Sequence, residues 1–166
     1  MPTEPTQQND GSKHPTTLPL LAMIGVLAMA VAPISAGAAP APREPAYDSA
    51  ATNCRVVDGD TLHCDGGRIR LLGIDAPELP GHCAQGRDCA PGDPYESSRS
   101  LGDAMGDGAS LRIAIVGTDR YGRTLAMVKG AKGDLSCWQL QHGQAIYKPR
   151  WDNGRLVASA CPNDAH

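Results

Sequence analysis

The chain has 166 residues, which is too short for two ordinary domains once its N-terminal segment is set aside. Its 15 Lys and Arg residues against 18 Asp and Glu residues give a formal net charge of −3. This balance excludes a protein that coats DNA through a broad basic surface, because such binding depends on many Lys and Arg contacts to phosphates.

The N-terminal segment carries a targeting pattern. Residues 19–34 form an apolar run, and the Ala36-x-Ala38 pattern that follows resembles a signal-peptidase site. The run is shorter than the ~20 residues of a typical membrane span. We therefore predict a signal peptide at residues 1–38 and export to the periplasm or the outside of the cell. The alternative is an uncleaved N-terminal segment that anchors the protein to the membrane.

Residues 39–51 separate this segment from the rest of the chain. They are rich in Ala and Pro and show little apolar periodicity, so we predict a disordered spacer. Residues 52–166 then form a single folded domain.

The pattern of this domain is mainly β. The Asp58-Gly59 dipeptide between two short apolar runs predicts a hairpin, and alternating aliphatic residues later in the chain predict a half-buried strand. Gly73 interrupts the alternation of the third strand, where a bulge would fit. We expect strands at residues 54–57, 62–64, 68–74, 111–116 and 124–129.

Two helices complete the predicted domain. Asp93 followed by Pro94 is a helix start signal, and this helix is expected to end near Gly106. Asp134 and Gly143 bound a second predicted helix, residues 135–142. Three strands, a helix, two strands and a helix is the element order of a small Greek-key barrel, so we predict an α+β fold built on a five-stranded barrel.

Six cysteines follow the predicted signal peptide, and an even number suits a disulfide framework in an exported protein. They are Cys54, Cys64, Cys83, Cys89, Cys137 and Cys161. Six cysteines permit 15 connectivities, among which sequence alone does not choose. Cys54 and Cys64 are equidistant from Gly59, so a hairpin there favours their pairing. Cys83 with Cys89, and Cys137 with Cys161, would then complete the set.

Three short sequence clusters contain the candidate catalytic and metal-binding residues. They are Asp58-Gly59-Asp60-Thr61, Arg70 to Glu78, and Asp119-Arg120-Tyr121-Gly122-Arg123. Asp60 and Asp75 offer carboxylate oxygens of the kind that hard cations such as Ca²⁺ prefer. Glu78 could accept a proton from water, and the planar guanidiniums of Arg70 and Arg123 match two phosphate oxygens. Together these groups predict metal-dependent hydrolysis of a phosphodiester.

In their order and spacing the clusters resemble the thermonuclease, or staphylococcal nuclease-like, family of calcium-dependent nucleases. The resemblance runs from about Cys54 to about Pro149. It implies an OB-fold, metal ligation by Asp60, Asp75 and the backbone carbonyl of Ala76, and a general base at Glu78. Many relatives have threonine where this chain has Ala76, and a backbone ligand tolerates that change.

The resemblance also implies how the substrate is held and cut. Arg70 and Arg123 correspond to the phosphate-binding arginines, while Arg120, Tyr121 and Tyr147 are expected to contact the nucleic acid. We expect a monomeric endonuclease that cleaves DNA or RNA and leaves 3′-phosphate ends. The alternative function is a non-catalytic OB-fold module that binds nucleic acid without cutting it.

Overall fold

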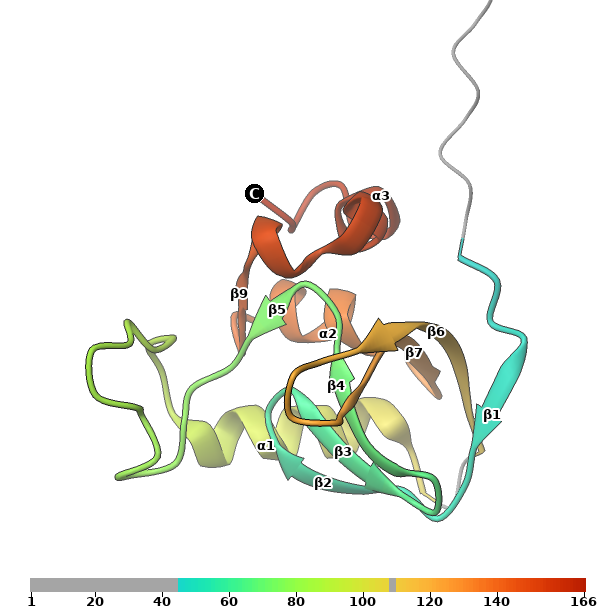
Figure 1. The fold of residues 1–166 in the computed structure, drawn as a ribbon, viewed down its shortest axis with the longest axis horizontal. Coiled ribbons are helices and arrows are strands. Elements are labelled where there is room, and N and C mark those ends of the chain that lie inside the picture. Colours follow the sequence, from blue (N-terminus) through green and yellow to red (C-terminus); the bar gives the residue numbers. More distant parts are fainter. Residues whose placement is uncertain (1–44, 108–109) are drawn as a thin grey trace, which may run out of the picture. The chain divides into compact units, whose positions relative to one another are not determined.

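The computed structural model describes residues 45–107 and 110–166 of the chain (Figure 1). Two predicted parts lie outside the described residues: the signal peptide, residues 1–38, and residues 39–44 of the spacer. In chain order the elements are β1 (Ser49–Ala51), β2 (Arg55–Asp58), β3 (Thr61–Cys64), β4 (Gly67–Leu71), β5 (Ile74–Asp75), α1 (Pro94–Met105), β6 (Leu111–Thr118), β7 (Thr124–Gly130), β8 (Gly133–Asp134), α2 (Leu135–Gln141), β9 (Ile146–Tyr147), the 3-10 helices η1 (Pro149–Trp151) and η2 (Asn153–Arg155), and α3 (Leu156–Ala160).

The strands form a mixed sheet that curls into a half-barrel (Figure 1). Its strand order is β1-β6-β7-β4-β3-β2, and β8 is added to β7. β4 and β7 run parallel, whereas the other neighbouring strands are antiparallel. β5 and β9 pair separately. The fold is therefore α+β and OB-like, and a closed five-stranded Greek-key barrel stays a prediction.

The strands expected from the sequence correspond to β2, β3, β4, β6 and β7, but the third one is shorter than predicted. Residues 68–74 do not form one strand, because the sheet strand β4 ends at Leu71 and β5 begins at Ile74. Gly73 between them has φ +72°, and a Cβ atom there would lie 2.9 Å from Cγ2 of Val157. This glycine turns the chain away from the main sheet toward β9.

The predicted spacer extends too far toward the domain. Residues 49–51 form β1, which pairs with β6, and the nearby ring of Tyr47 is buried. An edge strand requires only backbone hydrogen bonds along one side, so small residues such as Ala50 and Ala51 are compatible with it. The Ala-rich composition alone was not a sufficient reason to exclude a strand.

Both predicted helices are confirmed, with Asp93 and Asp134 as their N-caps. The Asp93 carboxylate accepts hydrogen bonds from the backbone N–H groups of Tyr95 (2.8 Å) and Glu96 (3.3 Å) at the start of α1. The Asp134 carboxylate accepts one from the N–H of Cys137 (3.0 Å) at the start of α2. Each carboxylate satisfies donors that have no partner within the helix.

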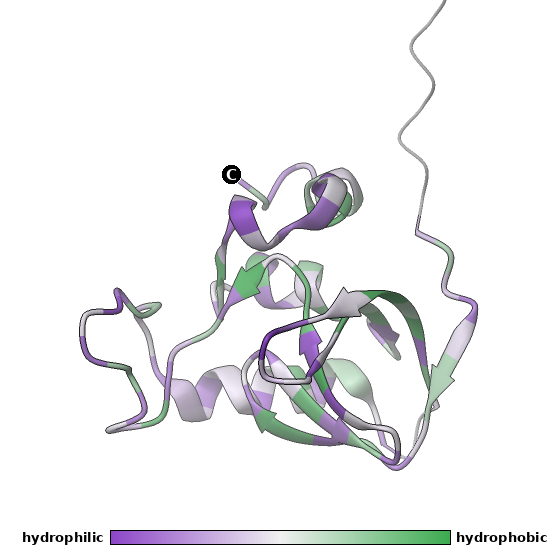
Figure 2. Cartoon of the chain, in the orientation of Figure 1, coloured by the Kyte–Doolittle hydropathy of each residue, from purple (hydrophilic) through white to green (hydrophobic). Residues whose placement is uncertain are grey.

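The core is built mainly from aliphatic side chains, in keeping with a chain that contains no Phe. Figure 2 shows apolar sequence along the strands of the half-barrel. The largest apolar side chains that are fully buried include Leu62, Leu71, Leu101, Leu111 and Met127. The four leucines belong to one cluster that packs the sheet against α1, and Met127 belongs to a second cluster, so the strands that carry the candidate site rest on packed side chains.

Three disulfides staple the domain, and all three favoured pairings are confirmed. They are Cys54–Cys64, Cys83–Cys89 and Cys137–Cys161. Three disulfides are typical of proteins that fold in an oxidising compartment. Among residues 45–107 and 110–166, no helix is both long and apolar enough to cross a membrane.

The tight packing of the first hairpin gives a test of the fold. A Cβ atom at Gly59 would lie 1.9 Å from Oγ of Ser97 and 2.8 Å from Cβ of Ala76. We therefore expect Gly59→Ala to lower the free energy of unfolding by about 1–3 kcal/mol, as overpacking does elsewhere. Gly66→Ala is the control, because its Cβ would meet nothing within 4 Å and should change the free energy by less than about 0.5 kcal/mol. Denaturant unfolding measures both, and equal stability of the two variants would contradict the packing.

Candidate active site

The first site residue, Asp60, lies in the turn between β2 and β3. Its carboxylate is buried, and Oδ1 accepts a hydrogen bond from Oγ1 of Thr61 (3.0 Å). Oδ2 accepts one from the backbone N–H of Ala76 (2.8 Å), which joins the turn to the end of β5. The amide of Gln139 on α2 donates to the carbonyl of Gly59 (2.7 Å) and fixes the turn from the other side. The hairpin thus places Asp60 in a defined position beneath the surface.

Arg70 on β4 connects the two predicted metal ligands. Its guanidinium forms an ion pair with Asp60 through Nη1. Nη2 donates to the carbonyl of Ile74 (3.1 Å) and lies 3.3 Å from Oδ1 of Asp75. All three charged side chains are buried, so the sequence-predicted residues Asp60, Arg70 and Asp75 come together in one buried ion cluster.

The surroundings of Arg70 act on its pKa in opposite directions. Burial lowers the pKa from its usual value, and the positive charge of Arg123 lowers it further. The carboxylates of Asp75 and Asp58 raise it and offset only part of that decrease. Arg70 is thus a buried cation that depends on the neighbouring carboxylates for its compensation.

Asp75 has the features expected of a metal ligand. It is fully buried, its Oδ1 is engaged by arginine, and its Oδ2 has no hydrogen-bond partner among the described residues. The nearest charged group to Oδ2 is Nζ of Lys148, at 3.8 Å. A buried carboxylate oxygen without a donor is costly, and a hard cation would satisfy it. The residues present therefore fit a hard cation held by Asp60 and Asp75.

Glu78 follows the buried cluster and is more accessible, with 22% of its side chain exposed. Its Oε1 forms an ion pair with Nη1 of Arg87 (2.6 Å). Nη2 of the same guanidinium pairs with Oδ1 of Asp75. Arg87 was not among the residues predicted from the sequence, although its place between Cys83 and Cys89, just after Glu78, was a usable signal.

The pKa of Arg87 is shifted in the opposite direction from that of Arg70. Burial acts to lower the pKa of Arg87, but the ion pairs with Asp75 and Glu78 outweigh this effect and raise the pKa overall. One third of the side chain remains exposed. Arg87 therefore stays charged while it reaches into the site from a surface loop.

The third sequence cluster forms a tight turn between β6 and β7. Oδ1 of Asp119 accepts hydrogen bonds from the N–H groups of Tyr121 and Arg123, both at 2.9 Å. Oδ2 pairs with Nε of Arg123 at 2.7 Å. Arg120 lies over the ring of Tyr121, 4.7 Å from its centroid. Desolvation acts to raise the pKa of Asp119, but the hydrogen bonds from Arg123 and Tyr121 lower it overall.

A cavity of about 960 Å³ unites most of these residues. Arg70, Glu78, Arg120, Tyr121 and Arg123 all line it, as the sequence predicted for a shared site. The metal-ligand candidates Asp60, Asp75 and Ala76 do not line it but lie buried behind Arg70. The backbone carbonyl of Ala76 stays a predicted ligand.

Tyr147 stands apart from this arrangement. Its hydroxyl donates to Oδ2 of Asp152 (2.8 Å), and its side chain does not line the cavity within the described part of the chain. Desolvation and the hydrogen bond to Asp152 raise the pKa of Tyr147. Its predicted contact with nucleic acid stays a prediction, and its visible role is to hold the segment that follows β9.

That segment brings Trp151 into the cavity. Trp151 is 43% exposed, and its ring centroid is 5.5 Å from Cζ of Arg70 and 5.7 Å from Cζ of Arg87. The N–H of Gly73 donates to the carbonyl of Trp151 (3.2 Å), and the N–H of Lys148 donates to the carbonyl of Gly73 (2.8 Å). Trp151 was not among the residues predicted from the sequence, although an aromatic residue beside Lys148 and Arg150 is a recognisable signal for nucleic-acid contact.

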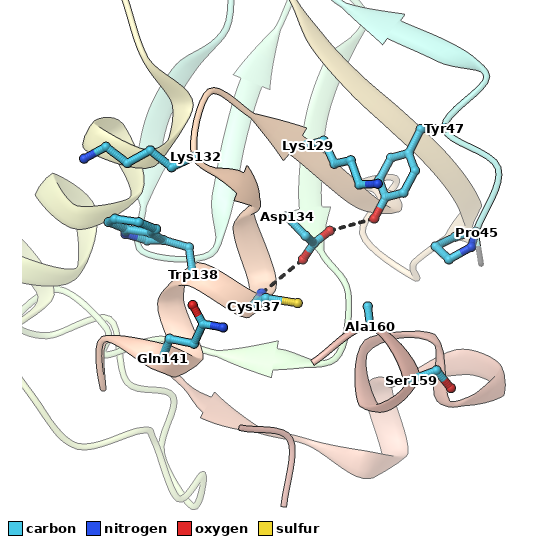
Figure 3. Close-up of a pocket in the computed structure, with 10 residues that line it drawn as sticks. All are labelled: Pro45, Tyr47, Lys129, Lys132, Asp134, Cys137, Trp138, Gln141, Ser159 and Ala160. Atoms are coloured by element: carbon cyan, nitrogen blue, oxygen red, sulfur yellow. Dashed lines mark hydrogen bonds between the residues drawn. The ribbon is translucent and has the colours of Figure 1, made fainter. Parts of the chain in front are cut away.

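A second cavity, of about 570 Å³, lies elsewhere in the domain, between β7, β8, α2 and α3 (Figure 3). There Asp134 accepts hydrogen bonds from the hydroxyl of Tyr47 (2.9 Å) and the N–H of Cys137, and desolvation raises its pKa. Asp134, Cys137 and Cys161 are the only three metal-ligating side chains of the described residues that lie within 4.8 Å of one another. Because both cysteines are in a disulfide, their sulfurs are not thiolate ligands.

Comparisons with known proteins give two relatives. The chain is 34% identical to a succinoglycan biosynthesis protein, ExoI, of Rhizobium meliloti (strain 1021), over 63% of this chain and 55% of that protein. It is 35% identical to an uncharacterized endonuclease of Haemophilus influenzae, over 66% of this chain and 60% of that protein. The chain thus spans less than two thirds of either relative. No protein-family model matches it.

The segment that positions Trp151 depends on Asp152, which sequence analysis did not single out. Its buried carboxylate accepts hydrogen bonds from the hydroxyl of Tyr147 and the N–H groups of Val157 (3.0 Å) and Ala158 (2.9 Å). We expect Asp152→Ala to lower the free energy of unfolding by at least about 2 kcal/mol, because it leaves several donors unpaired. Asp103→Ala, at an exposed position of α1, is the matched control and should change it by less than about 0.5 kcal/mol. Thermal unfolding measures both.

Proposed function

We propose that this protein is an exported, calcium-dependent nuclease of the thermonuclease-like family, which hydrolyses phosphodiester bonds of DNA or RNA and leaves 3′-phosphate ends. The observation that carries the proposal is the buried Oδ2 of Asp75, which accepts no hydrogen bond from the described residues and has Lys148 only at 3.8 Å; it lies in a cluster with Asp60 and Arg70 behind a cavity lined by Glu78 and Arg123. The endonuclease name of one relative supports the reaction class. The three disulfides support folding outside the cytoplasm.

Asp60 and Asp75 would hold the calcium ion, together with the carbonyl of Ala76. When bound, the ion supplies positive charge that offsets the negative charge of the substrate phosphate. Because only two protein carboxylates are involved, the affinity would be modest and suited to calcium concentrations outside the cell.

The remaining groups have separate roles in the hydrolysis. Glu78 accepts the proton of the attacking water, since its carboxylate lines the cavity and is 22% exposed. Arg123 and Arg70 donate to the phosphate oxygens on which negative charge develops. Arg120 and Tyr121 hold the neighbouring part of the strand at the mouth of the cavity.

Arg123 is the better arginine for testing this function. Its side chain is 25% exposed and pairs with Asp119, so its removal leaves the buried cluster intact. Removal of a donor to the developing charge typically lowers turnover by about 10²–10³-fold. We expect at least this loss for Arg123→Ala in calcium-dependent cleavage of denatured DNA. Arg99→Ala on α1 is the control, because Arg99 is exposed and pairs only with Glu96 among the described ion pairs.

The same assay includes Glu78→Gln, Arg70→Ala and a chelator. Glu78→Gln keeps the size of the side chain and should abolish cleavage. Arg70→Ala should lower turnover as well, but it also removes the buried counter-charge of Asp60 and Asp75, so thermal unfolding of this variant must be measured too.

An Arg123→Ala variant with turnover within tenfold of the parent would refute the role of Arg123. Binding of DNA without cleavage by the parent would favour the non-catalytic OB-fold module.

Trp151 is expected to stack on a base of the substrate. Stacking of a base on an aromatic side chain contributes about 1–3 kcal/mol. Trp151→Ala should therefore weaken the binding of single-stranded DNA by an amount in this range, whereas Trp151→Phe should keep most of the affinity. A titration of each protein with single-stranded DNA, in the presence of a chelator, measures both affinities. Trp138→Phe is the control, because Trp138 stacks on His142 near the second cavity. Equal weakening for an abasic strand would mean that Trp151 acts only through the arginines beside it.

A further inference from the structure

The loop between β5 and α1 contains Arg87, whose guanidinium lies in the site but has no role in the proposed mechanism. The Cys83–Cys89 disulfide closes this loop around Arg87. Within the ring, the N–H of Arg87 donates to the carbonyl of Ala84 (3.0 Å), and Sγ of Cys83 lies 3.5 Å from the carbonyl of Arg87. The backbone of Arg87 is therefore held in place by covalent and hydrogen-bonded contacts near the candidate site.

The side chain of Arg87 bridges the two functional carboxylates. One terminal nitrogen pairs with Oδ1 of Asp75 and the other with Oε1 of Glu78. Oδ1 of Asp75 also lies 3.3 Å from Nη2 of Arg70. A single guanidinium from a surface loop thus links the proposed metal ligand to the proposed base.

The carboxylates of this cluster already form ion pairs with cationic side chains before any metal ion binds. Three carboxylates meet three cationic side chains, namely Asp60, Asp75 and Glu78 with Arg70, Arg87 and Lys148. A divalent cation that bound to these carboxylates would be repelled by the cationic side chains already beside them. Charges a few ångströms apart interact strongly away from water. Binding of the ion would therefore be favoured by the departure of one cationic side chain.

Arg87 is the cation best able to leave. Arg70 is buried on β4 and donates to three separate groups. Lys148 lies 3.8 Å from Asp75, so its departure would remove less of the positive charge that opposes a bound ion. Arg87 has one third of its side chain exposed and comes from a loop outside the sheet, so it can turn toward solvent without disrupting a strand.

We propose that Arg87 is an internal counter-cation that competes with the metal ion for Asp75 and Glu78, so that the disulfide-closed loop sets the affinity of the site for the cation. This inference rests on the proposed metal site at Asp60 and Asp75. The ion and the guanidinium are alternative sources of positive charge for the same carboxylates. Loss of the arginine charge should therefore tighten binding of the ion.

The test is calcium binding to the oxidised protein by calorimetry, in the absence of nucleic acid. We expect Arg87→Gln to bind Ca²⁺ about tenfold more tightly than the parent, within the usual size of coupling between two binding events. Arg87→Lys keeps the charge and should remain closer to the parent. Arg99→Gln makes the same change in net charge on α1 and should leave the affinity unchanged.

The contribution of the loop is measured separately with Cys83→Ser combined with Cys89→Ser. Without the disulfide, holding Arg87 over the site costs more chain entropy, so this variant should also bind Ca²⁺ more tightly than the parent. Addition of Arg87→Gln to the serine pair should then give less than the sum of the two separate effects, because both act through Arg87. A cooperative thermal unfolding transition shows whether each variant folds.

The outcomes separate this inference from the function on which it rests. Tighter binding by Arg87→Gln, with Arg99→Gln unchanged, supports the competition. Unchanged or weaker binding by Arg87→Gln overturns it, even if the parent binds calcium and cuts DNA. Absence of calcium binding in the parent and in every variant overturns the proposed metal site itself, and the competition with it.

Discussion

The buried ion cluster of Arg70, Asp60 and Asp75 is the constraint on which the rest of the site depends. A charge taken out of water is expensive unless an opposite charge and hydrogen bonds compensate it. Each member of this cluster therefore needs the others, and their positions follow from the strands that carry them. Such a cluster is a poor source of stability compared with apolar packing. Buried ion clusters of this kind are common at functional sites.

The fold brings the cluster together by a break in one strand. If β4 continued through residue 74, the alternation of side chains would fix Asp75 by the pleat of the main sheet. The positive φ of Gly73 ends that register, and the short pair of β5 with β9 carries Asp75 to the guanidinium of Arg70. The backbone of the same glycine forms hydrogen bonds with the backbones of Lys148 and Trp151, so one turn positions both the buried carboxylate of Asp75 and the aromatic wall of the cavity.

Local patterns predicted the parts of this molecule that depend on near neighbours in sequence. The hairpin around Gly59, the caps Asp93 and Asp134 and the disulfide across the hairpin are of this kind, although the turn lies at residues 59–60, one residue later than predicted. The sequence also predicted that Arg70, Glu78 and Arg123 share one site. It did not predict the contact of Arg87 with Asp75 or the approach of Trp151, because loop conformation and the path after β9 depend on tertiary packing. The edge strand β1 was missed because its partner, β6, lies some sixty residues away in sequence.

The cavity also explains how an acidic protein could bind a polyanion. The whole chain carries a formal net charge of −3, yet its cavity is lined by five arginines and only three carboxylates. The arginines gather because four separate segments meet at this surface: β4, the disulfide-closed loop, the turn between β6 and β7, and η1. Attraction at close range depends on the local field and not on the net charge, which is screened by salt beyond about 10 Å. Recognition would therefore be confined to the few phosphates that enter the cavity, and the acidic remainder of the surface would oppose non-specific coating of nucleic acid.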